Sequence, residues 1–416
     1  MPARIRSLVL DRAEVGIYHC YARCVRRAFL CGVDPVSGLD CSHRRGWIRS
    51  RLEALASIFA IDVLGHGILD NHYHTVLRNH PSLPTTWSDE EVCKRWMRLS
   101  RHRLELKDPP RKKQLEKLLK DAKSIAEWRA RLSDISWFML MLNEPIARIA
   151  NEEDKKSGHF LAERFGCVRL QTDESILACS LYVDLNLIRA NIAETPEDST
   201  FTGACDRILD WMSETIARGE KPSVRIRELL GLSNDTDEFD DKMLTAKLRS
   251  GWMSPIREEG DGYSGVAAGR RASDTGFLPI SQQHYFELLD ELGRKAAPGK
   301  KGVIPETLPP ILERLGFDTE RWEEAAKSTQ RRFAYLDQLA SNQRAERALN
   351  DEKSPERPQG AALGAKVVSL ETDVHDSENQ NAVTHSNDDR RRHTTRSDRR
   401  HRPRHEDHDL REDELR

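Results

Sequence analysis

The sequence lacks long apolar segments. A membrane-spanning helix needs roughly eighteen consecutive apolar residues, and the richest apolar stretch, ISWFMLMLNEPIARIA, is interrupted by Asn143 and Glu144. Near the N-terminus the short run SLVL ends at Asp11 and Arg12, so the sequence has no apolar core of a signal peptide. We therefore expect a soluble, cytoplasmic protein that does not contact a membrane.

Paired cysteines are also missing. The eight cysteines include no C-x-x-C pair, and the spacing of Cys31, Cys41 and His43 matches no standard zinc ribbon or finger. Without a secretory signal, reduced thiols are the expected state. The sequence thus favours neither a disulfide framework nor a structural zinc site.

A strong net charge is absent, because 66 basic and 68 acidic residues give a formal charge of −2. The charges are unevenly distributed, however, and local clusters decide whether a polyanion is attracted. Arginines gather in two N-terminal clusters, Arg23, Arg26 and Arg27 and then Arg44, Arg45, Arg49 and Arg51. Each cluster is either a solvated surface or a phosphate-binding surface, and charge alone does not decide between them.

What the sequence does have is a pattern of short strands among helices. Apolar periodicity predicts an antiparallel hairpin of strands 61–68 and 72–78, joined by the tight turn Leu69-Asp70-Asn71. The other expected elements are a strand at 15–25, a strand or hairpin element at 158–171, and helices at 47–59, about 88–99 (capped by Ser88), 112–132, 134–151 and 173–189. We expect Pro145 to kink or interrupt its helix. This order is typical of the α+β class, with one small antiparallel sheet flanked by helices.

The character of the chain changes after about residue 200. Helical patterns continue through an accessory region, 201–349, in which Ser281 caps one helix and the segment TLPPILERLGF forms another. We find no chemistry in this region. From residue 350 to 416 large apolar residues are scarce, which predicts a disordered charged tail that either solubilises the protein or contacts nucleic acid nonspecifically.

The triplet His72-Tyr73-His74 is the first candidate for chemistry. Side chains alternate along a strand, so both imidazoles lie on one face, and paired neutral imidazoles suit a divalent metal. The alternative is a pair of histidines on a half-buried strand.

A second candidate lies on the helix expected at 173–189. Tyr182, Asn186 and Arg189 follow i, i+4, i+7 spacing and therefore share one face of an otherwise apolar helix. The ordinary alternative is a boundary tyrosine, an asparagine that faces water and an arginine at the helix C-terminus.

Together the two segments resemble the REP-associated tyrosine transposases, a branch of the single-tyrosine HUH nucleases. Five features carry the resemblance: Asn71 before the His-x-His strand, the segment Gly158–Phe165 (GHFLAERF, compared with GHLWQGRF), Tyr182-x-x-x-Asn186, the run Asn186–Asn191, and Pro196-Glu197-Asp198. The likeness covers about residues 10–200. Four features depart from the family: Tyr73 is larger than the usual aliphatic residue, the insert at 80–155 is long, Leu187 replaces a proline, and the helical region after residue 205 has no counterpart in the compact members.

The resemblance implies a specific chemistry. Tyr182 would attack a phosphate of single-stranded DNA, leaving a 5′-phosphotyrosine and a free 3′-hydroxyl. A Mg²⁺ or Mn²⁺ ion held by His72, His74 and the amide oxygen of Asn186 would polarise that phosphate. Asp184 ranks below Asn186 as a third ligand, because it lies off the tyrosine face of the helix.

The substrate that the resemblance implies is single-stranded DNA folded into a hairpin. Five arginines are the expected contacts to its phosphates, namely Arg23, Arg26, Arg27, Arg164 and Arg189. Two other functions stay open: a catalytically silent hairpin-DNA-binding protein or repressor on the same fold, and a metallohydrolase with His-x-His on a barrel strand. The second needs more strands than the sequence predicts. The sequence does not choose between a monomer and a dimer.

Overall fold

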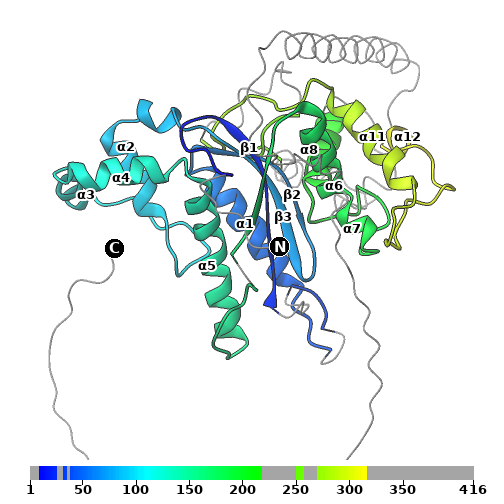
Figure 1. Ribbon diagram of the computed structural model, residues 1–416, viewed down its shortest axis with the longest axis horizontal. Coiled ribbons are helices and arrows are strands. Elements are labelled where there is room, and N and C mark those ends of the chain that lie inside the picture. The colour runs from blue at the N-terminus through cyan, green and yellow to red at the C-terminus, as the bar shows by residue number, and fades with distance from the viewer. Residues whose placement is uncertain are drawn as a thin grey trace, which may run out of the picture. The chain divides into compact units, whose positions relative to one another are not determined.

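Four antiparallel strands form one sheet in the computed structural model, which describes residues 9–25, 31–34, 38–162, 164–217, 250–256 and 269–315. The strands are β1 (Gly16–Arg23), β2 (Ile61–Ile68), β3 (His72–Asn79) and β4 (Gly166–Leu170), in the order β2-β3-β1-β4 (Figure 1). The predicted α+β class with one small antiparallel sheet is confirmed. The predicted hairpin is confirmed as well, since the Leu69 amide donates to the His72 carbonyl across the turn at 2.9 Å.

Helices cover both faces of this sheet. Those before β4 are α1 (His43–Ala56), the short 3₁₀ helix η3 (Leu83–Thr86), α2 (Asp89–Arg98), α3 (Lys112–Leu118), α4 (Ala122–Arg131) and α5 (Ile135–Glu153). Those after β4 are α6 (Asp173–Asp184), α7 (Asn186–Arg189), α8 (Gly203–Ala217), α11 (Gln282–Arg294) and α12 (Ile311–Arg314). No helix in the described ranges is long and apolar enough to cross a membrane.

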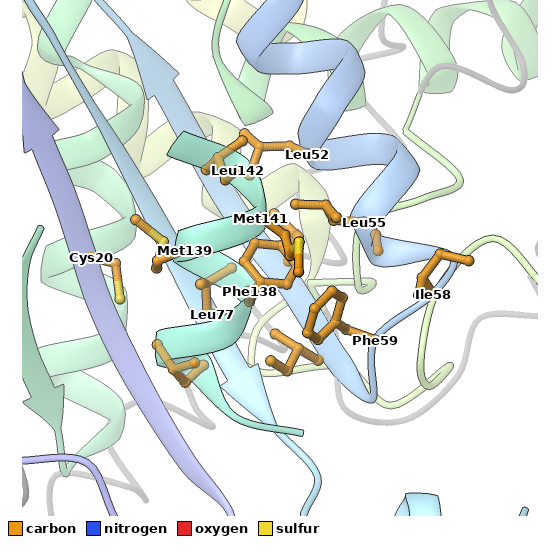
Figure 2. Close-up of a cluster of buried hydrophobic side chains, with 14 of the residues drawn as sticks. Cys20, Leu52, Leu55, Ile58, Phe59, Leu77, Phe138, Met139, Met141 and Leu142 are labelled. Carbon is orange, nitrogen blue, oxygen red and sulfur yellow. The ribbon is translucent and has the colours of Figure 1, made fainter. Parts of the chain in front are cut away.

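The first face of the sheet packs against α1 and α5. Alternate residues of β1 and β3, among them Cys20 and Leu77, meet Leu52 and Leu55 of α1 and Phe138 of α5 (Figure 2). Every one of these five side chains is fully buried, which makes this cluster a continuous hydrophobic core. Because successive strand residues point to opposite faces, the residues between them, including His72 and His74, lie on the other face.

The second face packs against helices from later in the chain. Val76 of β3 and Leu64 of β2 share a core with residues of α6, α8, α11 and α12, among them Val183 and Ile208. This core joins residues on both sides of residue 200, since Val76 and Leu64 lie in the same cluster as Ile208. The described parts of the accessory region therefore complete the core of the sheet. The expected tail, 350–416, lies outside the described residues.

Two expected helices differ in detail. The single helix expected at 112–132 is two helices, because Asp121 accepts a hydrogen bond from the Ser124 amide at 3.0 Å and caps a new helix there. Pro145 lies within α5 and does not end it.

Ser88 and Ser281 cap α2 and α11 as predicted, each by accepting a bond of 3.2 Å from an amide three residues later. The helix in TLPPILERLGF is confined to α12, after Pro309 and Pro310.

Gly67 on β2 allows α6 to approach the sheet closely. A Cβ atom at this position would lie 2.6 Å from the carbonyl oxygen of Val183, a backbone atom that cannot move aside alone. Gly65, two residues earlier on the same strand, has open space where its Cβ would be. The two glycines thus form a matched pair for measuring the value of this approach.

We expect Gly67→Ala to lower the free energy of unfolding by about 1–3 kcal/mol, because an added methyl group overpacks the contact with α6. Gly65→Ala should change it by less than about 0.5 kcal/mol. Urea unfolding followed by circular dichroism measures both. Equal effects of the two substitutions would show that the close approach does not govern stability.

Candidate functional site

His72 and His74 lie side by side on the second face of the sheet. Their ring centroids are 5.0 Å apart, and His74 is 6% exposed. In the register of β1 and β3, His74 is opposite Tyr21 and His72 is opposite Arg23. The pair therefore points toward the side of the sheet that α6 and α7 cover.

Tyr182 and Asn186 reach the same place from the helical side. Helix α6 is assigned up to Asp184, yet bonds of 2.9 Å from the Leu185 amide and from the Arg189 amide continue the helical geometry into α7. The four-residue spacing between Tyr182 and Asn186 consequently keeps both side chains on one face. The ring centroid of Tyr182 lies 5.5 Å from that of His74. The structure thus brings the two predicted motifs together.

Hydrogen bonds fix which nitrogen each histidine presents. His72 Nδ1 lies 2.5 Å from Asn71 Oδ1, and because that oxygen only accepts, Nδ1 carries the proton and Nε2 keeps its lone pair. This is the arrangement in which a metal-binding histidine is oriented by a second partner. Asn71, which the sequence marks only by its place before the strand, therefore orients the imidazole of His72.

His74 is oriented by a residue that sequence reasoning missed. Its Nδ1 lies 2.9 Å from His19 Nε2, while its own Nε2 is buried without a hydrogen-bond partner. When His74 Nδ1 donates to His19, Nε2 is left with a lone pair, as metal binding requires. The signal for His19 was its place on a strand expected at 15–25, but only the pairing of β1 with β3 brings it to His74.

Burial keeps all three histidines neutral. It lowers the pKa of His19 to about 4; it also lowers that of His72 to about 4, with help from the charges of Arg23 and Lys300. The pKa of His74 is held well below its usual value by burial and then by the neighbouring histidines and the same two cations. Neutral imidazoles are the form that binds metal, so the histidines need no deprotonation near neutral pH.

The donor set fits a divalent cation that keeps open coordination positions. Asn186 is 3% exposed and its Nδ2 has no hydrogen-bond partner, and turning the amide would put Oδ1 in the position of Nδ2. No group of three His, Cys, Asp or Glu side chains converges as a metal site in the described ranges. A metal here would rest on His72, His74 and Asn186, with phosphate oxygens and water completing its shell.

Asp184 faces away from this place. Its Oδ2 accepts from the Tyr285 hydroxyl at 2.6 Å and its Oδ1 from the Ala204 amide at 3.0 Å. Burial raises the pKa of the Asp184 carboxyl to about 6. Its ranking below Asn186 as a ligand agrees with these contacts.

Tyr182 is accessible, with 41% of its surface exposed. Burial of part of the side chain raises the pKa of the phenol, while the nearby Asn186 amide and the charge of Arg23 lower it. A cation at the site would push this pKa further down.

The five candidate DNA-binding arginines have different positions. The charge of Arg23 acts on His72, His74 and Tyr182, which places it at the site. Arg164 is exposed, and Arg26 and Arg27 lie outside the described residues. The guanidinium of Arg189 donates to backbone carbonyls of α11 and of the segment after it, so its contact with DNA stays a prediction.

No protein-family model, no curated protein and no solved structure matches this chain. Its function is therefore argued from the geometry of the site and from the motifs that the site brings together.

The pKa of His19 predicts a pH dependence of stability. The folded-state pKa is about 4 and the unfolded value about 6.5, so the unfolded chain binds the proton more readily and stability falls as pH drops from 6.5 toward 4. Between pH 7 and pH 5, we expect the free energy of unfolding to fall by about 1–2 kcal/mol less in His19→Gln than in the unchanged protein. Urea unfolding in metal-free buffer tests this, and parallel losses in both proteins would contradict it.

Proposed function

We propose that this protein is a metal-dependent single-strand DNA transesterase of the single-tyrosine HUH type, acting as a transposase on hairpin-forming DNA. The observation that carries the proposal is the position of Tyr182, whose ring lies 5.5 Å from that of His74, beside two neutral imidazoles and an unpartnered buried amide. This is the combination that tyrosine attack on a phosphate needs: a nucleophile, and a place for the cation that activates its target.

His72, His74 and Asn186 would hold Mg²⁺ or Mn²⁺. Asn71 and His19 support this role by orienting the two imidazoles. The metal supplies charge that draws electrons from the phosphate and stabilises the developing negative oxygens. The three side chains form the binding site for the metal. Because the two imidazoles are neutral, no proton has to be displaced when a metal binds.

Tyr182 forms the covalent bond. Its Oη attacks phosphorus, the bond from phosphorus to the 3′ oxygen breaks, and the phenolic proton is lost as the 3′ oxygen gains one from water. The product is a 5′-phosphotyrosine and a free 3′-hydroxyl, so the energy of the broken linkage is kept for rejoining. Because burial raises the pKa of Tyr182, the reaction depends on nearby positive charge, which Arg23 supplies in part.

The open part of the sheet suits a single strand. Tyr21 on β1 and Val168 on β4 are 42% and 50% exposed, and the Tyr21 ring centroid lies 5.9 Å from that of His74. Exposed aromatic rings next to basic groups bind unpaired bases by stacking. Exposed Arg164 is a candidate phosphate contact near β4. Hairpin DNA with unpaired bases is therefore the substrate class that we propose.

Two tyrosines at the site allow a matched test. Tyr182→Phe should abolish the covalent adduct with a labelled hairpin oligonucleotide in Mn²⁺ and leave DNA binding within about threefold, because only the nucleophilic oxygen is lost. Tyr21, a tyrosine about as exposed as Tyr182, is the control: Tyr21→Phe also removes a hydroxyl and should keep the adduct. Denaturing gel electrophoresis measures the adduct, and a mobility shift measures binding. If Tyr21→Phe loses the adduct and Tyr182→Phe keeps it, the assignment of the nucleophile to Tyr182 is wrong.

The alternative is a silent hairpin-DNA-binding protein or repressor. It predicts binding without an adduct in any divalent metal, and the same assay separates it from the enzyme. The buried, partnerless atoms at His74 and Asn186 favour the enzyme, since a protein that only binds DNA has no need to keep them unsatisfied.

A further inference from the structure

One loop of the accessory region packs on α7, the helix that begins at Asn186. It follows α11 and runs from Lys295 to Gly302, with the sequence KAAPGKKG. The proposed function uses residues of the sheet and of α6 and α7 and leaves this loop without a role. Its position, however, is fixed by contacts that begin one helical turn after Asn186.

Arg189 fastens the loop to α7. Its Nη1 donates to the carbonyl of Lys295 and, at 3.5 Å, to that of Gly302, while its Nη2 donates to the carbonyl of Leu292. One guanidinium thus ties the end of α11 and both ends of the loop to the helix that carries Asn186. A planar cation with five donors is suited to such a junction of carbonyls.

Two glycines shape the loop against the helix. A Cβ atom at Gly302 would lie 1.7 Å from the carbonyl oxygen of Ile188, so only glycine permits this contact. Gly299 has a φ of +70°, a left-handed conformation that favours glycine, and the Lys300 amide donates to the Ala297 carbonyl at 3.1 Å. Lys300 therefore sits at a tight turn of a loop that α7 holds in place.

Lys300 has no carboxylate partner in the part of the chain that the structure describes. The preceding cations are paired, Lys295 with Glu291 at 2.6 Å and Arg294 with Asp290 at 2.9 Å. The positive charge of Lys300 instead acts on His72 and His74, together with that of Arg23. The charges of Arg23 and Lys300 thus reach two neutral imidazoles, and the Nε2 atom of one of them, His74, has no hydrogen-bond partner.

An exposed lysine is ordinarily only a solvated charge. Here its loop is held on α7, and the charges that act on His72 and His74 are those of cations. In such surroundings a metal would be repelled unless an anion bound with it. A phosphate supplies that anion, because it binds to a lysine ammonium and a divalent metal at the same time.

We propose that Lys300 binds the phosphate that Tyr182 attacks, and that Arg189 positions Lys300 by holding the 295–302 loop on α7. This inference rests on the proposed function and adds a substrate-binding residue from the accessory region. Lys300 would contact a non-bridging oxygen of the phosphate and stabilise the charge that grows there as the bond to Tyr182 forms.

The test compares Lys300 with its neighbour Lys301, which is also exposed. With a hairpin oligonucleotide from DNA flanking the gene and Mn²⁺, Lys300→Ala should slow adduct formation about 10- to 100-fold, and Lys300→Arg should stay within about threefold of the unchanged protein. Lys301→Ala should react at the unchanged rate. Loss of one phosphate contact should also reduce the slope of log K against log[salt] by about 0.7 in Lys300→Ala alone.

Arg189→Ala tests the positioning. When Lys300 is present, Arg189→Ala should slow adduct formation. When it is added to the Lys300→Ala variant, it should slow the reaction by less than about threefold further, because the residue that Arg189 positions is already gone. Additive losses would show that Arg189 acts independently of Lys300. Thermal melting of each variant controls for loss of folding.

The outcomes separate the two proposals. If the unchanged protein forms an adduct and Lys300→Ala matches Lys301→Ala in rate and salt slope, the assignment of Lys300 fails and the enzyme stands. If the unchanged protein binds the hairpin but forms no adduct in any metal, the transesterase fails and the assignment of Lys300 to the attacked phosphate fails with it.

Discussion

The close contact of α6 with the sheet is the constraint on which the site depends. Because Gly67 has no side chain, the backbone of Val183 lies directly on β2, and the residue before Val183 is Tyr182. Tyr182 and the pair His72 and His74 come from segments more than a hundred residues apart in the sequence. The rigid stacking of a helix on a strand, and not a flexible loop, sets the distance between them.

Electrostatics complement this geometry. Among the residues that the structure describes, no acidic group joins the histidine cluster. The nearest carboxylate on the tyrosine helix, Asp184, is turned into the core and bonded to Tyr285. Arg23 and Lys300 then give the cluster a positive surrounding. If the proposed metal binds here, this positive surrounding would favour a metal that arrives with phosphate over a metal alone.

The sequence was sufficient wherever local chemistry decides the structure. The hairpin at 61–78, the caps at Ser88 and Ser281, and the four-residue spacing of Tyr182 and Asn186 depend on neighbours in the chain, and each is found where it was expected. Whether these residues perform the proposed reaction stays a prediction, since no comparison bears on it.

What the sequence could not predict depends on long-range pairing. His19 became part of the site only through the order of strands, which places β1 next to β3. The capping of α4 by Asp121 was readable in principle, but the apolar period continued across it. The roles proposed for Arg189 and Lys300 depend on the packing of the loop after α11 on α7, and no local sequence pattern encodes that packing. An accessory region without motifs was for that reason taken to lack chemistry.

The bond between Asp184 and Tyr285 has a consequence for how such a chain can change in length. Asp184 is 2% exposed and caps α8 through the Ala204 amide, and Tyr285 is 1% exposed and comes from α11. A shorter chain that ended near residue 200 would leave this carboxylate without both partners, on the same helix as Tyr182. It would also uncover the face of that helix that packs against α8 and α11, so residues 1–200 by themselves should be less stable than the same residues in the full chain.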